Sequence, residues 1–296
     1  MRVAVLDVGS NTARLLVADV GAAALEPVAT ARTYLGLGAE IADTGTLRRK
    51  TIAAAARVCG KYAHRARELG VERAQVIVTA PGRQGAAAVE LFAALRERTR
   101  LPVRILSAED EGRLAYDGAL ARLVGASPDT VGVVDVGGGS TEIVVGRPGR
   151  EPSWLRSFDL GSLRLTRLVL ASDPPSRREL GKARAAARET FAGLDAPRPA
   201  VALATGGSAR ALAKLVGRTF DQGDSDAAVA ILSRRRSTKI AREVGIDPSR
   251  AATVLGGVLL LGEASRALRR PLTLARGGLR EGAALALAAE RVAEAA

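Results

Sequence analysis

The feature that most constrains this chain is a segment that occurs twice. Residues 3–18 align without a gap on residues 131–146, with an offset of 128 positions throughout. In each copy an apolar run ends in an aspartate, Asp7 or Asp135, and a short polar, glycine-containing turn leads into a second apolar run. This pattern predicts strand, tight turn and strand. A duplicated hairpin indicates two related half-molecules, and we expect the two turns to face each other across one cleft.

The length and charge of the chain limit the classes of ligand. With 296 residues it is long enough for two domains, each with its own core. The net charge of +13 indicates either a polyanionic partner or an arginine-rich composition without functional meaning. Aromatic residues make up only 3% of the chain, which leaves few side chains to stack on bases and disfavours sequence-specific nucleic acid binding. A phosphate-rich ligand without bases fits better.

Other classes of protein are excluded by what the sequence lacks. The chain has one cysteine, Cys59, and one histidine, His64, so an internal disulfide is excluded and a histidine-based metal site or triad is disfavoured. Both residues lie in a stretch predicted to be helical, where we interpret them as structural. The longest apolar stretches, such as residues 254–262, are too short to span a bilayer, and the N-terminus has no signal-peptide pattern. We therefore expect a cytoplasmic protein with no membrane partner.

Outside the duplicated hairpins, strand and helix patterns alternate, which indicates α/β layers. The polar residues 43–46 are predicted to open the first long helix, and residues 125–129 form the best domain boundary. Strands are predicted at residues 25–32, 75–80, 103–106, 153–160, 201–204 and 272–275. Helices are predicted at residues 47–69, 85–98, 107–124, 175–194, 209–216, 226–244, 248–268 and 279–295.

Asp7 and Asp135 are candidate metal ligands. A carboxylate at a strand end beside a glycine turn is a typical place to hold Mg²⁺, which takes one or two carboxylates and completes its octahedron with phosphates and waters. The alternative is a turn aspartate that bonds its own backbone. Because the aspartate recurs in register in both copies, we favour the functional interpretation.

The two turns are candidate phosphate sites. Successive glycines let the backbone approach a ligand closely, and their N–H groups form a nest for an anion. The alternative is a flexible hairpin tip, which three consecutive glycines between two apolar runs make less plausible. The candidate phosphate-binding residues of the two turns are Ser10 and Asn11 in the first copy and Gly137, Gly138, Gly139, Ser140 and Thr141 in the second.

Two charged positions differ between the copies. Arg14 aligns with Glu142, so Arg14 would add positive charge for phosphate and Glu142 would join the metal shell. From spacing alone, each is equally well explained as a solvent-facing strand residue. Arg83 follows a predicted strand end and could reach the cleft, but in a chain with 44 basic residues a single arginine is weak support.

Two predicted helix starts also carry candidate residues. Residues 205–208 precede a helix, so Gly206, Gly207 and Ser208 form either an anion site or an N-cap. Residues 107–110 are typical of a capping box, which places Glu109 to Glu111 in the first helical turn. There the helix dipole stabilises carboxylates and keeps them ionised, ready to accept a proton from water. On sequence alone we favour helix-end electrostatics for this acidic group.

Taken in order along nearly the whole chain, these motifs resemble the exopolyphosphatase / guanosine pentaphosphate phosphatase (Ppx/GppA) family of the actin–sugar kinase–Hsp70 superfamily. No single motif decides the resemblance, but seven occur in the family's order. They are residues 7–14, 79–83, 107–113, 135–142, 160–166, 204–213 and 278–282.

The resemblance implies an α/β fold of two ribonuclease-H-like (actin-like ATPase) domains with an interdomain cleft. The first domain would comprise residues 1–125 with the C-terminal helix of about residues 281–296, and the second residues 126–280. The resemblance also implies hydrolysis of a terminal phosphoanhydride with Mg²⁺, or Mn²⁺ in its place, and a homodimer. Glu111 matches the family's catalytic glutamate and Arg83 a phosphate-contacting arginine. Metal-shell positions match Asp7, Asp135 and Glu142.

The chain departs from the family pattern at positions that bear on substrate choice. The first-domain R-L-G-E-G element appears as residues 34–38 without its arginine and glutamate, and the usual S-D-G becomes residues 275–277 with an added cation, Arg276. The family's long members continue into a further helical domain, so this chain would be the short form.

We therefore expect an exopolyphosphatase that acts on inorganic polyphosphate. The close alternative is hydrolysis of the 5′ γ-phosphate of guanosine pentaphosphate, which the low aromatic content mildly disfavours. A non-catalytic sensor of polyphosphate or nucleotide is disfavoured because Glu111, Asp7 and Asp135 are all present. A kinase of the same superfamily is disfavoured because motifs for an acceptor domain are absent.

Overall fold

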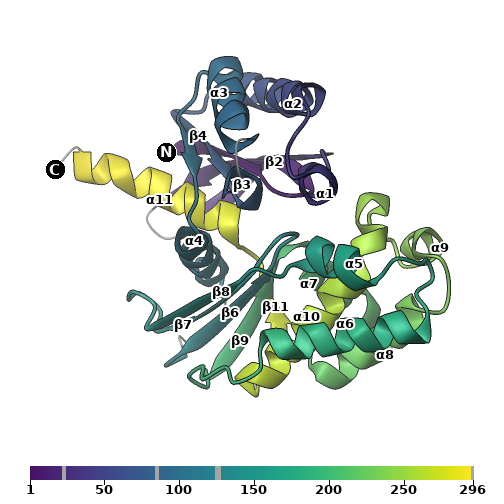
Figure 1. Ribbon diagram of the computed structural model, residues 1–296. Coiled ribbons are helices and arrows are strands. Elements are labelled where there is room, and N and C mark those ends of the chain that lie inside the picture. The colour runs from purple at the N-terminus through teal and green to yellow at the C-terminus, as the bar shows by residue number, and fades with distance from the viewer. Residues whose placement is uncertain (22–24, 84–86, 124–127, 295–296) are drawn as a thin grey trace. The chain divides into compact units, whose positions relative to one another are not determined.

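The computed structural model describes residues 1–21, 25–83, 87–123 and 128–294 (Figure 1). The chain divides into two compact units. Unit 1 comprises Met1–Arg122 and Gly277–Ala296, and unit 2 comprises Leu123–Arg276. Each unit is built on its own mixed sheet covered by helices.

Unit 1 contains a five-stranded sheet in the order β3-β2-β1-β4-β5. Antiparallel pairing joins β1 to β2 and β2 to β3, whereas β1, β4 and β5 run parallel. The apolar runs of β1 and β2 are buried on both faces, as expected for central strands between helical layers. The strands are β1 (Arg2–Val8), β2 (Thr12–Val20), β3 (Leu25–Tyr34), β4 (Arg73–Val78) and β5 (Val103–Ile105).

Helices of unit 1 cover the two faces of this sheet. One core joins Ala4 and Leu6 of β1 to α1, α2 and α3, and the other joins Val3 and Val5 to α11. The helices α4 and α11 cross closely, because a Cβ atom on Gly118 would lie 1.9 Å from the carbonyl oxygen of Gly278. The helices are α1 (Leu37–Thr44), α2 (Arg49–Glu68), α3 (Ala87–Thr99), α4 (Ala108–Leu120) and α11 (Leu279–Glu294), with a 3₁₀ turn η1 (Ala80–Arg83).

Unit 2 contains a six-stranded sheet in the order β10-β11-β9-β6-β7-β8. Its centre repeats unit 1: β6 pairs antiparallel with β7 and parallel with β9, as β1 pairs with β2 and β4. The duplicated hairpin of the sequence is thus the central strand pair of each unit. The strands are β6 (Val131–Val136), β7 (Thr141–Gly146), β8 (Trp154–Phe158), β9 (Val201–Thr205), β10 (Thr219–Phe220) and β11 (Leu272–Leu274).

The core of unit 2 is centred on α10 (Val254–Leu268), which is buried along almost all of its length. Among the described residues one helical stretch, Arg250–Leu268, is long and apolar enough to cross a membrane by length and composition, and 83% of it is buried inside the protein. This stretch includes the apolar run of residues 254–262, which is by itself too short to span a bilayer, and extends it at both ends. The other helices of unit 2 are α5 (Ser162–Val169), α6 (Arg177–Thr190), α7 (Gly206–Val216), α8 (Gln222–Leu232), α9 (Ser237–Glu243) and the 3₁₀ turn η2 (Pro248–Thr253).

The predicted α/β class with two related units is confirmed, whereas several local predictions are wrong. Residues 43–46 do not open the first long helix, because Thr44 ends the unpredicted helix α1 and Gly45 caps it with a φ of 72°. The predicted helix 226–244 is two helices, since Arg236 is extended and interrupts the hydrogen-bond ladder. The short elements α5 and β10 were not predicted either. Residues 84–86 and 124–127, which include parts of the predicted helix start and domain boundary, lie outside the described residues.

Candidate active site

The two hairpins place their aspartates at equivalent positions. Asp7 lies opposite Arg14 in the β1–β2 ladder, and Asp135 lies opposite Glu142 in the β6–β7 ladder. We call the connecting residues loop L1 (residues 9–11) and loop L2 (residues 137–140). Each loop is closed by the same bond: the N–H of Gly9 donates to the carbonyl of Thr12 at 3.0 Å, and that of Gly137 to Ser140 at 3.0 Å. The sequence repeat is therefore a repeat of backbone geometry.

The carbonyl groups of both loops are held by the start of a following helix. In unit 1, Gly38 N donates to Ser10 O at 2.7 Å, and Leu35 N to Asn11 O at 2.8 Å. In unit 2, Leu163 N donates to Gly138 O at 3.0 Å at the start of α5. Because the carbonyls are engaged on one side, each loop has a defined conformation.

The loop amides are left for a ligand. Among the residues that the structure describes, the N–H groups of Ser10 and Asn11 in L1, and of Gly138, Gly139 and Ser140 in L2, donate to no backbone carbonyl. Consecutive N–H groups with a shared orientation make an anion-binding concavity. The arrangement supports the expectation of a phosphate site at each loop.

Residues 34–38, which lack the arginine and glutamate of the family pattern, hold loop L1 through their backbone N–H groups. Leu37 is fully buried in the core of unit 1, where the family pattern has a glutamate, and Tyr34 is half exposed where it has an arginine. The element still supplies the backbone donors that hold L1. The charged side chains of the family pattern are replaced here by packing.

Asp7 lies in a largely apolar part of unit 1. It is only 8% exposed, and the buried thiol of Cys59 on α2 lies close enough to feel its charge. Burial, with a smaller contribution from the negative charge of Asp7, raises the pKa of Cys59 to about 12. A buried thiol with a raised pKa agrees with the interpretation of Cys59 as a structural residue. The other residue interpreted as structural, His64, is exposed on α2, where its Nε2 lies 3.3 Å from Glu68 Oε1.

Asp135 belongs to a polar row across unit 2. Strand pairing aligns Ser157, Glu142, Asp135 and Thr205 on β8, β7, β6 and β9. Residues in register on adjacent strands point to the same face of a sheet. The hydroxyl of Ser157 donates to Glu142 Oε1 at 2.8 Å. Glu142 is 1% exposed, which excludes the alternative of a solvent-facing strand residue.

The helix α7 begins directly beside Asp135. Gly206 has a φ of 86°, and a Cβ atom there would lie 2.7 Å from Asp135 Oδ1. Thr205 is the N-cap residue, but its side chain makes no capping bond. Its hydroxyl is buried and has no hydrogen-bond partner among the described residues. The Thr205 side chain therefore does not cap α7, and an anion site at this helix start stays a prediction.

Arg250 is a candidate residue that the sequence did not single out. It lies in η2, 43 positions after Gly207 in the chain, yet a Cβ atom on Gly207 would lie 1.9 Å from Arg250 Nη1. The guanidinium therefore lies directly against the start of α7. No local sequence signal distinguishes it from the other basic residues.

Glu111 and Arg83 form the central charged pair of unit 1. Ser107 caps α4 by accepting from Asp110 N at 3.0 Å, which places Glu111 in the first helical turn. Arg83 Nη1 donates to Glu111 Oε2 at 2.8 Å and to Leu106 O at 2.9 Å. Glu111 is 6% exposed, whereas the neighbouring Glu109 is exposed and pairs with Arg113. The structure therefore separates one buried, anchored carboxylate from the acidic group.

The candidate metal ligands do not form a large cluster. Within the described ranges, no group of three or more His, Cys, Asp or Glu side chains is arranged to hold a metal ion. Asp135 and Glu142, opposite each other in the β6–β7 ladder, form a pair of hard oxygen donors. Mg²⁺ commonly uses one or two carboxylates in this way, so the donor chemistry of the pair fits that ion.

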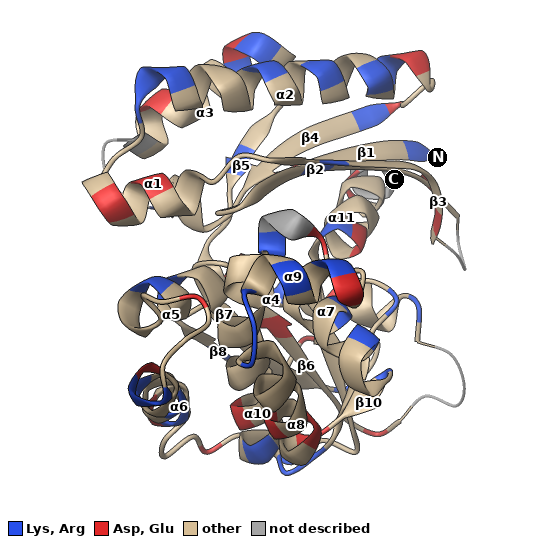
Figure 2. Ribbon diagram, turned by 90° about the vertical axis from the view of Figure 1, so that its right-hand side faces the viewer, with Lys and Arg blue, Asp and Glu red and all other residues tan. Residues whose placement is uncertain are grey.

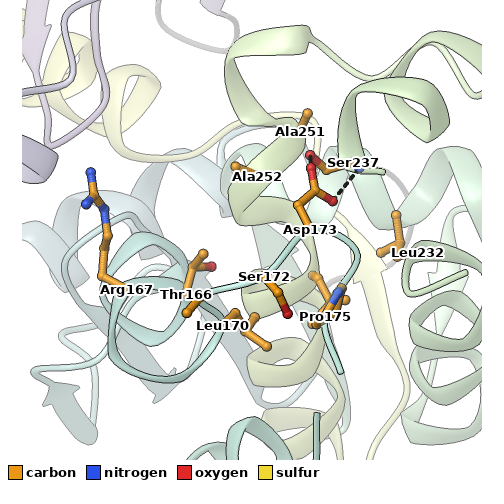
Figure 3. Close-up of a pocket in the computed structure, with 12 residues that line it drawn as sticks. Thr166, Arg167, Leu170, Ser172, Asp173, Pro175, Leu232, Ser237, Ala251 and Ala252 are labelled. Atoms are coloured by element: carbon orange, nitrogen blue, oxygen red, sulfur yellow. Dashed lines mark hydrogen bonds between the residues drawn. The ribbon is translucent and has the colours of Figure 1, made fainter. Parts of the chain in front are cut away.

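Unit 2 also contains a cavity of about 480 Å³ between α5, the segment after it, α9 and the start of α10 (Figure 3). Its walls combine leucine and alanine side chains with a few polar groups. Asp173 lies at its edge and accepts from Ser237 N at 2.7 Å and from Ser237 Oγ at 2.8 Å. This bond ties the segment after α5 to α9.

Comparison with known proteins decides the family. The model of the "Ppx/GppA phosphatase family" matches residues 16–290. The chain belongs to the Ppx/GppA phosphatase family.

Individual relatives span nearly the whole of this Ppx/GppA chain. Exopolyphosphatase 2 of Mycobacterium tuberculosis is 31% identical, covering 97% of this chain and 98% of its own length. Exopolyphosphatase 1 of the same organism is 29% identical, with 95% of this chain and 87% of its own length covered. The PPX-GPPA enzyme of Aquifex aeolicus superposes with a TM-score of 0.81 at 26% identity, covering 97% of this chain and 99% of that structure. The resemblance inferred from the motifs is thereby confirmed, while the roles of the individual site residues stay predictions.

Proposed function

We propose that this Ppx/GppA member is an exopolyphosphatase, which hydrolyses the terminal phosphoanhydride of inorganic polyphosphate and releases orthophosphate. The observation that carries the proposal is the buried Glu111 carboxylate, held by Arg83 at the start of α4. The names of the two mycobacterial relatives support the choice of substrate.

The proposed reaction is an in-line displacement at the terminal phosphorus. Glu111 orients a water molecule and takes one of its protons as the oxygen–phosphorus bond forms. The bond to the bridging oxygen breaks, and the shortened chain leaves with the electron pair. Phosphoryl transfer needs little from a base beyond orientation, so a carboxylate fixed by an arginine is well suited to the role.

The loop amides of L1 and L2 and the start of α7 are proposed to bind phosphate oxygens. Fixed N–H donors stabilise the charge that develops on the equatorial oxygens, because they need no reorganisation during the reaction. Arg14, whose Nε donates to Thr12 Oγ1 at 3.2 Å beside L1, and Arg83 would add positive charge. Ser208 and Gly207 would contribute at the start of α7.

Mg²⁺, with Mn²⁺ as the alternative, is the proposed cofactor. Asp135 and Glu142 would hold it, and the bound cation would offset the negative charge of the phosphate chain, while Asp7 as a third ligand stays a prediction from the sequence. A cation is also needed for electrostatic reasons, since carboxylates lie beside both proposed phosphate sites and would otherwise repel the substrate. The homodimer and the cytoplasmic location stay predictions from the resemblance and the sequence.

Guanosine pentaphosphate remains the alternative substrate, because the family name covers both activities. A guanosine ligand needs a pocket for its base, and the low aromatic content of the chain does not favour one. A sensor without catalysis would bind polyphosphate and release no phosphate. The three hypotheses, which are an exopolyphosphatase, a guanosine pentaphosphate hydrolase and a sensor, predict different results in one assay of phosphate release.

The test is Mg²⁺-dependent phosphate release from polyphosphate and from guanosine pentaphosphate, for the wild type and for Glu111→Gln. We expect release from polyphosphate to fall at least about 100-fold in the variant, as for loss of a general base. The matched control is Glu109→Gln, which removes an exposed carboxylate from the same helical turn and should stay within about twofold of wild type. Undiminished release by Glu111→Gln would overturn the assignment of the base. Release from the nucleotide alone would favour the alternative substrate, and binding without release would indicate a sensor.

A further inference from the structure

The 3₁₀ turn η2 connects the candidate phosphate site of unit 2 to the cavity of about 480 Å³. Arg250 of η2 lies against Gly207 at the start of α7. The next two residues, Ala251 and Ala252, line the cavity, together with Thr166 and Arg167 of α5. The turn η2 therefore borders both the start of α7 and the cavity within unit 2.

Close in the chain to residues that line the cavity are four basic residues, which we call the basic rim: Arg177, Arg178, Arg236 and Lys239. The first two follow Pro175, which lines the cavity, and the last two flank Ser237, which also lines it. The hydrogen bonds from Ser237 to Asp173 bring these two segments together (Figure 3). Figure 2 shows basic residues on both α6 and α9.

The basic rim is not used by the fold. All four side chains are exposed, and none makes a hydrogen bond or ion pair with another described residue. Two nearby basic residues, by contrast, are paired. Arg184 pairs with Asp226, and Arg235 with Glu243. The four side chains of the basic rim are thus available to bind an anion.

The position of Arg177 and Arg178 also has an electrostatic cost. They are the first two residues of the 14-residue helix α6, where the helix dipole is positive and disfavours cations. An anion bound near them would remove this repulsion. The fold alone gives no reason for two arginines at this end of the helix.

The segment that carries the rim is held in one conformation. Glu179 accepts hydrogen bonds from the N–H groups of Ala171, Ser172 and Ser176, at 2.9, 2.9 and 2.7 Å. The hydroxyls of Ser172 and Ser176, with these N–H groups, hold the pKa of Glu179 well below its usual range. Asp173, the acidic group at the cavity edge, is engaged by both donors of Ser237. Binding of a ligand would therefore need little ordering of the backbone in this segment.

We propose that the basic rim and the adjoining cavity bind the part of an inorganic polyphosphate chain that lies beyond its terminal phosphates. This inference rests on the proposed function, for which it specifies a site that favours long chains over short ones. A flexible chain of closely spaced negative charges fits four unpaired cations, and the absence of aromatic residues among those lining the cavity disfavours a nucleic acid. The binding is electrostatic, so it releases counterions and weakens with salt.

The test is the variant Arg177→Gln/Arg178→Gln/Arg236→Gln/Lys239→Gln, assayed with tripolyphosphate and with long-chain polyphosphate. We expect KM for the long chain to rise about 10-fold or more, and kcat/KM for tripolyphosphate to stay within about twofold. The slope of log KM against log salt for the long chain should become shallower by about 3, as for four lost phosphate contacts on a single-stranded polyanion.

The matched control is Arg49→Gln/Lys50→Gln/Arg57→Gln/Lys61→Gln on α2 of unit 1. It removes the same charge from four exposed residues that also have no partner among the described residues. We expect this variant to keep the wild-type KM for the long chain. An equal rise of KM in the control, or an equal loss on tripolyphosphate in the rim variant, would overturn the proposal.

A direct measurement of binding tests the basic rim independently of whether the protein hydrolyses polyphosphate. Calorimetric titration of long-chain polyphosphate into wild type and both variants measures the rim even if no substrate is hydrolysed. Weaker binding by the rim variant alone supports the proposal. Displacement of polyphosphate by single-stranded RNA of equal charge with equal affinity would instead identify a general polyanion surface and refute a site for the substrate chain.

Discussion

Replacing Gly206 by alanine should damage both the stability and the activity of unit 2. Gly206 has a φ of 86°, and an alanine in the left-handed region costs about 1–2 kcal/mol. Its Cβ atom would also lie 2.7 Å from Asp135 Oδ1 and 3.3 Å from the carbonyl oxygen of Val136. Moving the Asp135 side chain off its rotamer adds about 0.5–1.5 kcal/mol. We therefore expect a loss of about 1.5–3.5 kcal/mol in the free energy of unfolding.

The assay is urea denaturation combined with phosphate release. Because the clash is with a proposed metal ligand, kcat should fall by more than tenfold even where the variant is fully folded. The control is Gly181→Ala in α6, where a Cβ atom would meet nothing within 4 Å and helix propensity favours alanine. That variant should gain about 0.5–1 kcal/mol and keep its activity. A Gly206→Ala protein that unfolds within 0.5 kcal/mol of wild type, with unchanged kcat, would refute the argument from backbone conformation and contact.

Two further predictions concern stability. Glu40 accepts hydrogen bonds from Arg48 and Thr51, and the Arg48 guanidinium is the main cause that lowers its pKa to about 2. Since the Arg48 side chain is exposed and solvent screens the pair, this stabilisation is about 1 kcal/mol. A lowered pKa in the folded state means that it is complete above the ordinary value of 4.5 and is lost as the pH falls towards 2. We therefore expect urea denaturation to show that Glu40→Gln lowers the free energy of unfolding more at pH 7 than at pH 3. An equal loss at both pH values would contradict this prediction. Tyr116 is 1% exposed, and its hydroxyl has no partner among the described residues, so Tyr116→Phe should gain about 1 kcal/mol in the same assay, whereas a loss would reveal a bound partner.

The elements of the hairpins could be predicted from the sequence because their signals are local. A strand between helical layers has a continuous apolar sequence, and a tight turn requires small or polar residues. The sequences of residues 3–18 and 131–146 contain both signals, so both hairpins could be predicted from them. The capping signal at residues 107–110 placed Glu111 in a first helical turn for the same reason. Local signals failed where a helix depends on its context. Helix α1 is short and packs on L1, and the break at Ser233–Arg236 lies inside a polar run that looks helical.

For the candidate site, too, the features with a local sequence signal were predictable and those that depend on tertiary packing were not. The sequence alone determined which motifs are present, that they occur twice in one register, and that the family is Ppx/GppA. Only the tertiary structure decided which member of the acidic group at residues 109–111 is buried, that Arg83 is its partner, and that Arg250 lies against Gly207. It also decided that the two segments bearing the basic rim are joined at one cavity by the hydrogen bonds of Ser237 to Asp173. These facts depend on segments far apart in the chain, and pairing and burial are properties of the packed chain rather than of a local window of sequence.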